Sequence, residues 1–113
     1  MSGASADADF AGRAQTAPDA VTDAAAELER LRAAIECIDR DIIALIAERV
    51  RIARGVGELK RAAGLPTLDP AREAVVVRRA GELARDAGLE DEDVRYIFWH
   101  LIGLSRRAQT GAA

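Results

Sequence analysis

An arginine interrupts an otherwise apolar helical seam in this 113-residue chain. Apolar residues from Leu28 onward recur in steps of three and four, the period of a long helix packed against other helices. Arg49 stands midway between Ile42 and Val56, where the same row should have another apolar residue. A guanidinium in a helical core is costly unless an anion meets it there. Arg49 therefore predicts the floor of an anion-binding site.

Two further cations lie on the same predicted helix. At 100° per residue, Lys60 lies about 20° around the helix from Arg49 and roughly 16 Å of rise along it. Both side chains can therefore converge on one small molecule in one groove. Arg32 lies about 26 Å of rise from Arg49, too far for the same pocket in one chain, but in an antiparallel dimer it can reach the partner's pocket. Taken singly, Lys60 and Arg32 fit solvated surface charges better than ligand-binding residues.

The helix that positions these cations is predicted to start at a cap at Thr22 or Asp23 and to end near Ala63. Gly64 suits a left-handed cap, and Pro66 prevents the helix from continuing. The apolar part of this helix would span about 48 Å, more than a domain of this size needs across its width. We therefore expect a partner chain to cover the apolar seam.

A second helix is predicted to begin at Asp69–Pro70, an acidic N-cap followed by proline at the first helical position. Gly88 suits its C-terminal cap. The apolar face expected for this helix is Val76, Ala80, Leu83 and Ala87.

A third helix is predicted to begin in the acidic stretch 90–93, which favours a helix N-terminus. The apolar row expected for it is Val94, Ile97, Phe98, Leu101 and Ile102. Ser105 and Gln109 continue this row, so a second helix also turns polar on its buried face. Near a helix end, such residues are more often frayed or surface positions.

Composition favours one all-α domain. Aromatic residues make up 4% of the chain and alanine is abundant, in agreement with the helical periodicity. Residues 1–24 are small, polar and weakly acidic and are predicted to be a disordered leader, with the helical domain at 25–113. The net charge of −3 argues against a nucleic-acid partner. No apolar run approaches the roughly 20 residues of a membrane span, and no secretory signal is recognisable, so a cytoplasmic protein is expected.

Four other residues allow limited predictions. Cys37 is the single cysteine, which excludes an internal disulfide, and its place between the seam residues Ile35 and Ile38 predicts a packed, inert thiol. Gly55 and Gly57 inside the first helix either mark a close backbone approach or are simply tolerated. His100 lies off the apolar row and is expected to be exposed, with no second His or Cys nearby to form a metal site.

The motifs of the chain occur in a characteristic order. They are LR at 31–32, ID at 38–39, LIAERV at 45–50, VGELK at 56–60, GLP at 64–66, DPAREA at 69–74, GL at 88–89 and IFWHLIGLSRRAQ at 97–109. This series resembles the all-helical (AroQ-type) chorismate mutases over residues 28–109, and the spacing needs no insertion.

The resemblance implies an intertwined homodimer of three-helix chains with two active sites for a small dicarboxylate. It implies the site residues Arg32, Arg49, Lys60, Asp69, Arg72, Glu73, Ser105 and Gln109. Arg32 would cross to the partner's site, and Arg49 would bind a substrate carboxylate. Lys60 would bind a carboxylate and the ether oxygen, Gln109 would also bind the ether oxygen, and Glu73 would contact the ring hydroxyl. Arg49, Lys60 and Gln109 would be the catalytic residues.

The implied reaction is the intramolecular rearrangement of chorismate to prephenate, which requires no nucleophile, general base, metal or cofactor. A mutase of 4-amino-4-deoxychorismate is an alternative, because the two substrates differ only at C4. Two weaker alternatives are isochorismate pyruvate lyase, whose loop lacks the D-x-x-R-E arrangement of residues 69–73, and a non-catalytic helical dimer. Arg106, where an apolar residue is expected, and Trp99 depart from the family pattern. Some family members are activated by a shikimate-pathway enzyme, so such a partner is a further candidate.

Overall fold

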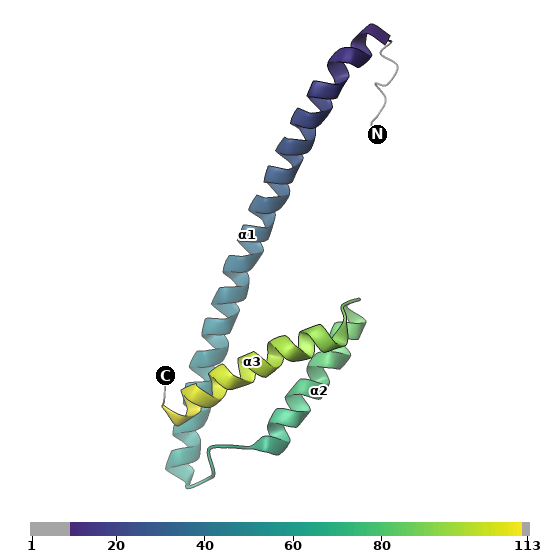
Figure 1. Ribbon diagram of the computed structural model, residues 1–113. Helices are drawn as coiled ribbons and strands as arrows, with labels where there is room; N and C mark the ends of the chain where they lie inside the picture. Colours follow the sequence, from purple (N-terminus) through teal and green to yellow (C-terminus); the bar gives the residue numbers. More distant parts are fainter. Residues whose placement is uncertain (1–9, 112–113) are drawn as a thin grey trace. The chain divides into compact units, whose positions relative to one another are not determined.

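The computed structural model describes residues 10–111, and the side chains of residues 19–111. This part of the chain is helical, with α1 at Phe10–Ala63, α2 at Pro70–Asp86 and α3 at Asp91–Thr110 (Figure 1). Residues 10–111 contain no strand, so the predicted all-α chain of three helices with a long first helix is confirmed. None of the three helices, as far as they are described, is both long and apolar enough to span a bilayer.

The first helix starts earlier than predicted. α1 begins at Phe10, so the prediction of a start at Thr22 or Asp23 is wrong, whereas the predicted end near Ala63 is confirmed. The upstream segment is rich in alanine, the strongest helix former, and a helix that already exists extends into such a segment at little cost. Residues 1–9 of the predicted leader lie outside the described residues. The domain boundary at residue 25 stays a prediction.

The chain divides into two compact units, Met1–Ile42 and Ile43–Ala113. In the first unit, every residue from 19 to 42 is exposed. The prediction that Cys37 is packed is therefore wrong within the single chain, because α1 is the only element described there. Five apolar side chains in this unit are 46–57% exposed: Leu28, Leu31, Ile35, Ile38 and Ile42.

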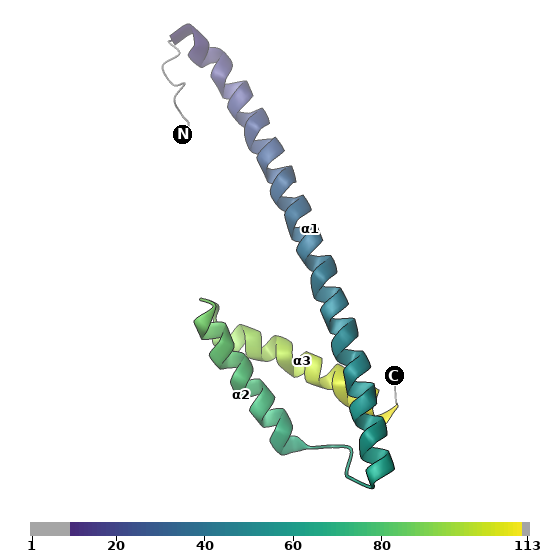
Figure 2. The same cartoon turned by 180° about the vertical axis from the view of Figure 1, so that it is seen from behind.

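The second unit combines the C-terminal part of α1 with α2 and α3. In both views α2 and α3 lie side by side, and the last turns of α3 lie against the C-terminal part of α1 (Figures 1 and 2). The buried apolar residues of this unit are mostly small: Ala53, Val76, Ala80, Ala84, Ile102 and Ala108. Small side chains let helices approach closely, which brings the polar residues of the three helices within reach of one another.

One of the two glycines in α1 lies at such a close approach. A Cβ atom added to Gly57 would lie 2.7 Å from the Cα of Gln109, whereas one added to Gly55 would meet nothing within 4 Å. The interpretation as a close backbone approach is thus confirmed for Gly57, and Gly55 is simply tolerated.

The predicted ends of α2 are confirmed. The Asp69 side chain accepts a hydrogen bond from the Arg72 backbone N–H at 3.0 Å, and proline follows at the first helical position. At the other end, Gly88 adopts a left-handed φ of 77°. Both ends of α2 are therefore fixed by local capping interactions.

The buried face of α2 differs from the prediction at two positions. Val76 and Ala80 are buried as expected, but Leu83 and Ala87 are exposed and Ala84 is buried instead. The buried row follows a strict four-residue step, which places an alanine rather than the bulkier leucine against the neighbouring helix.

The predicted N-terminus of α3 is confirmed, with Glu90 as N-cap. Asp91 accepts a hydrogen bond from the Arg85 guanidinium at 2.7 Å, which joins the end of α2 to the start of α3 and lowers the pKa of Asp91. In the predicted apolar row, Ile102 is buried, and Val94, Phe98 and Leu101 are half-buried. Ile97 is exposed and so was wrongly included, because it lies off the side of α3 that the rest of the unit covers. His100 is exposed, as predicted.

Candidate active site

A cavity of about 500 Å³ in the second unit gathers polar residues from all three helices. Its charged and polar lining consists of Arg49, Lys60, Asp69, Arg72, Glu73, Arg79, Ser105, Arg106 and Gln109. Seven of the eight site residues predicted from the sequence are therefore brought together. The eighth, Arg32, belongs to the other unit, where its guanidinium donates to Glu29 at 3.3 Å.

The guanidinium of Arg49 is held by α3. Its Nη1 donates to the Ser105 hydroxyl and, at 3.4 Å, to the backbone carbonyl of Leu101. The guanidinium carbon lies 6.0 Å from the centre of the Phe98 ring. Among the described residues, Arg49 forms no ion pair with an acid. The side chain is thus fixed in a half-buried position with donors left for an external anion.

Burial lowers the pKa of Arg49, and the neighbouring charges of Arg79 and Arg72 lower it further. All three causes act in the same direction, because each penalises the charged form of the guanidinium. An arginine remains protonated under such conditions. An anion that enters the cavity compensates the positive charge of Arg49 and of its two arginine neighbours.

Lys60 lies in the last turn of α1, which ends in a glycine cap. Gly64 has a φ of 70°, and the Leu65 N–H donates to the Lys60 carbonyl at 2.8 Å. The Lys60 ammonium donates to the Thr67 carbonyl at 3.0 Å and to Oε1 of Gln109 at 3.1 Å. An ammonium has three N–H donors, so one is left for a ligand.

The position of Gln109 depends on the contact between α1 and α3. Its backbone lies against Gly57, and its carbonyl accepts a hydrogen bond from Arg61 at 2.6 Å. Because the Gln109 Oε1 atom accepts from Lys60, the amide NH₂ group is available to donate into the cavity. Lys60 and Gln109 therefore form one connected pair of donors.

Two cavity arginines were not predicted as site residues. Arg79 lies seven positions after Arg72, two turns along the same face of α2, and this spacing is a signal that sequence reasoning could have used. Arg106 was noted only as a departure from the family pattern. It binds Glu73 through two hydrogen bonds, from Nη2 to Oε1 at 2.6 Å and from Nε to Oε2 at 3.2 Å. The carboxylate of Glu73 raises the pKa of Arg106.

The charges that line the cavity are unbalanced. Five side chains are cationic and two, Asp69 and Glu73, are acidic, an excess of three positive charges in a chain whose net charge is −3. A site of this kind favours a small anion with more than one negative charge. Among the described residues, no group of three His, Cys, Asp or Glu side chains could hold a metal ion.

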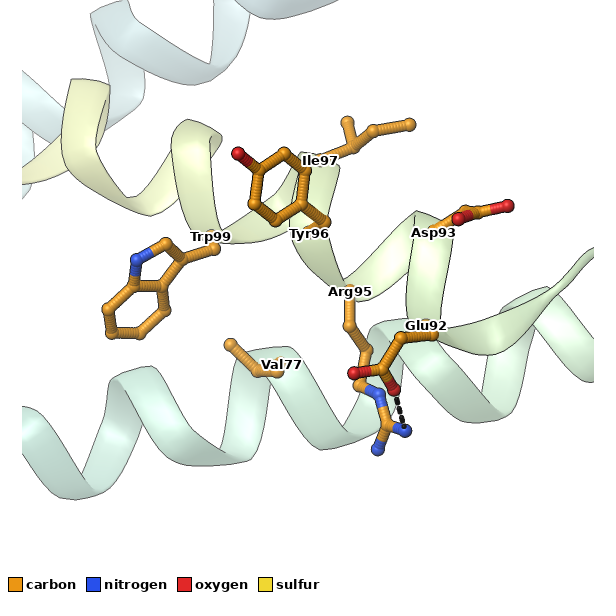
Figure 3. Close-up of a pocket in the computed structure, with 7 residues that line it drawn as sticks. All are labelled: Val77, Glu92, Asp93, Arg95, Tyr96, Ile97 and Trp99. Carbon is orange, nitrogen blue, oxygen red and sulfur yellow. Dashed lines mark hydrogen bonds and ion pairs between the residues drawn. The ribbon is translucent and has the colours of Figure 1, made fainter.

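A larger depression, of about 890 Å³, lies elsewhere on α2 and α3 and shares no lining residue with this cavity (Figure 3). Its lining includes Val77, Tyr96 and Trp99, and its charged pair Glu92 and Arg95 is joined at 3.0 Å. It offers no excess of cations for a dianion, so the smaller cavity is the better candidate site. Trp99 lies in this depression and not in the candidate site.

The fold and the cavity together define a helical domain with a cation-rich cavity. The family model described as chorismate mutase type II matches residues 31–110, and the chain belongs to this family. The resemblance inferred from the motifs is confirmed.

Individual relatives agree with this assignment. The chain is 34% identical to a chorismate mutase from Methanocaldococcus jannaschii over 83 residues, which cover 74% of the chain and 84% of that protein. It is 31% identical to a 4-amino-4-deoxychorismate mutase from Streptomyces venezuelae over 65 residues, with 58% and 63% covered. A solved structure, a conserved hypothetical protein from Pyrococcus furiosus, has a TM-score of 0.59 and 36% identity, with 73% of the chain and 93% of that structure covered.

One relative is much longer than the chain. It is a 3-dehydroquinate dehydratase from Pyrobaculum aerophilum, 40% identical over 62 residues, which cover 55% of the chain. The chain spans only 21% of the length of that protein.

Proposed function

We propose that the chain catalyses the rearrangement of chorismate to prephenate. The observation that carries this proposal is the meeting, in one cavity, of Arg49, which lacks an acidic partner among the described residues, with the paired donors Lys60 and Gln109. This arrangement occurs in a chain of the chorismate mutase type II family.

The reaction breaks a C–O bond as a C–C bond forms within one molecule. The protein has to hold a flexible dicarboxylate in a compact conformer and to stabilise the negative charge that grows on the ether oxygen. In our proposal Arg49 clamps one carboxylate with the part of its planar fork that faces away from Ser105. The free N–H of Lys60 and the amide of Gln109 donate to the ether oxygen, while Arg72 and Arg79 add positive charge around the second carboxylate.

A mutase of 4-amino-4-deoxychorismate is the second candidate. The Streptomyces venezuelae relative favours it, because that protein has this name and is 31% identical to the chain, against 34% over a longer match for the Methanocaldococcus jannaschii chorismate mutase. The roles of the clamping arginine and of the two ether-oxygen donors would be the same.

We further propose that two chains form an intertwined homodimer in which Arg32 of each chain reaches the site of the other. The exposed apolar seam of residues 28–42 supports this, since such a surface is typical of an interface. Within its own chain Arg32 contacts Glu29, three positions before it, in an exposed pair of little energetic value. A cytoplasmic location and a shikimate-pathway partner enzyme stay predictions.

The test is the loss of chorismate absorbance on addition of purified protein, with 4-amino-4-deoxychorismate measured in parallel and the products identified. Conversion of chorismate to prephenate at the higher kcat/KM supports the proposal. A higher kcat/KM for the amino compound would favour the second candidate. Release of pyruvate from isochorismate, or no turnover of any of the three compounds, would contradict both.

A further inference from the structure

The ion pair between Arg106 and Glu73 changes the chemistry of the cavity. It joins α3 to α2 through two parallel hydrogen bonds, and both residues line the cavity. The Glu73 side chain is 21% exposed and that of Arg106 is 43% exposed, so the carboxylate is the more enclosed partner. A two-point pair of this kind is the strong form of the arginine–carboxylate interaction.

The second acid of the cavity is also engaged. Oδ1 of Asp69 accepts from the Arg72 N–H as the N-cap of α2. Neither carboxylate in the cavity lining is therefore free of a protein partner. A bound ligand with a cationic group would face a lining in which five protein cations outnumber two acids, one of which is already paired with Arg106.

A neutral hydroxyl group does not have this difficulty. Each carboxylate oxygen has two lone pairs, so Glu73 can hold Arg106 and still accept one hydrogen bond from a hydroxyl. An ammonium at the same place would be repelled by Arg106 and would compete for a carboxylate whose charge is already compensated.

The two substrates considered above differ in this respect. Chorismate has a hydroxyl at C4, and the amino analogue has an amine, which is protonated at neutral pH. We propose that Arg106 is a specificity-determining residue that makes the site prefer the hydroxyl-bearing substrate. This inference rests on the proposed function, since it concerns the ligand of the same site.

The experiment compares the two compounds on the wild-type protein and on Arg106→Gln, which removes the charge and keeps a polar side chain. The readouts are the ratio of dissociation constants from calorimetry and the ratio of kcat/KM values. We expect the wild-type preference for chorismate to fall roughly tenfold in Arg106→Gln, the effect of one nearby, partly solvated charge. A ratio between two compounds on one protein does not depend on the fraction of protein that is folded.

Two further variants complete the test. Arg106→Lys keeps the positive charge and should retain most of the preference for chorismate. If the two-point pair had only a structural role, the preference would fall in both Arg106→Gln and Arg106→Lys. Arg107→Gln alters an exposed arginine outside the cavity lining and should leave the ratio unchanged.

An unchanged ratio in Arg106→Gln, or a wild-type preference for the amine, would overturn the inference. If both compounds bind but neither is converted, the proposed function fails and the binding ratio still decides the role of Arg106; if neither binds, both proposals fail.

Discussion

Arg49 stands in the apolar row of α1, half-buried, with its Nη1 bound to Ser105 and with no acid paired to it among the described residues. Such a side chain lowers stability, because its charge is partly desolvated without an opposite charge nearby. Its value lies in binding, where a fixed, planar guanidinium requires little rearrangement to receive a carboxylate.

We therefore expect Arg49→Leu to raise stability and to lower activity. Leucine restores the apolar row, and the free energy of unfolding should rise by about 1 kcal/mol. The value of kcat/KM should fall by roughly a hundredfold, the effect of losing two charge-assisted hydrogen bonds to the substrate. Urea denaturation and steady-state kinetics measure the two quantities. A variant that is less stable than wild type, or one that keeps its activity, would contradict this account.

Lys60 and Gln109 have a different expected signature, because they face the atom on which charge develops. Lys60→Ala and Gln109→Ala should each lower kcat by about 100- to 1,000-fold, the usual effect of removing one preorganised donor. The oligomeric state, measured by sedimentation, should not change. Arg107→Ala, an exposed residue on the same turn of α3 as Gln109 that does not line the cavity, is the control and should remain fully active. Near-normal turnover in either alanine variant would remove that residue from the catalytic set.

At the scale of the helices, the site depends on the close approach of α1 and α3. The backbone of Gln109 lies against Gly57, and the same turn of α3 is held by the Arg61 hydrogen bond to its carbonyl. The pair of donors is thus positioned by backbone contact, so its geometry depends on a residue that does not touch the ligand.

Gly57→Ala should consequently damage both stability and catalysis. The new methyl group would meet backbone atoms, which cannot turn aside, and the free energy of unfolding should fall by about 1–3 kcal/mol. The matched control is Gly55→Ala, where the methyl group meets nothing and helix propensity should add about 0.5–1 kcal/mol. Measurements of thermal unfolding and of kcat for Gly57→Ala and Gly55→Ala test this prediction. Equal effects of the two substitutions would show that the approach is not tight.

The start of α1 was predicted wrongly, but the other helix ends were predictable from the sequence because they depend on local chemistry. The Asp69 cap, Gly64 and Gly88 each act within a few residues of their own position. The buried face of α2 was predicted less well, because the choice of Ala84 over Leu83 depends on how closely α3 approaches. The pair Arg106–Glu73 joins positions 33 apart on two helices, and no local pattern predicts it. Eight site residues were predicted through a family resemblance and two helical spacings, and seven of them line the cavity, whereas the pairing of Glu73 with Arg106 was not predicted.

At the scale of the whole molecule, the apolar residues of positions 28–42 are exposed in the single chain, and Arg32 lies among them. An interface that buries this seam would be self-complementary in a two-fold dimer, so each chain would give and receive the same residue. The proposed dimer therefore predicts that two inactive variants can restore each other.

The pair to combine is Arg32→Ala and Lys60→Ala, each inactive as a pure dimer. In a mixed dimer, one site has the intact Lys60 of its own chain and the intact Arg32 of its partner, while the other site has both lesions. With random pairing, half of the dimers are mixed and one site in each of these is intact, so co-expression should restore about a quarter of the wild-type activity. Differently tagged chains allow mixed dimers to be isolated, and these should have about half of the wild-type kcat per dimer. If Arg32 instead served a site in its own chain, every site of the mixed dimer would have one lesion, and its activity would stay at the level of the single variants.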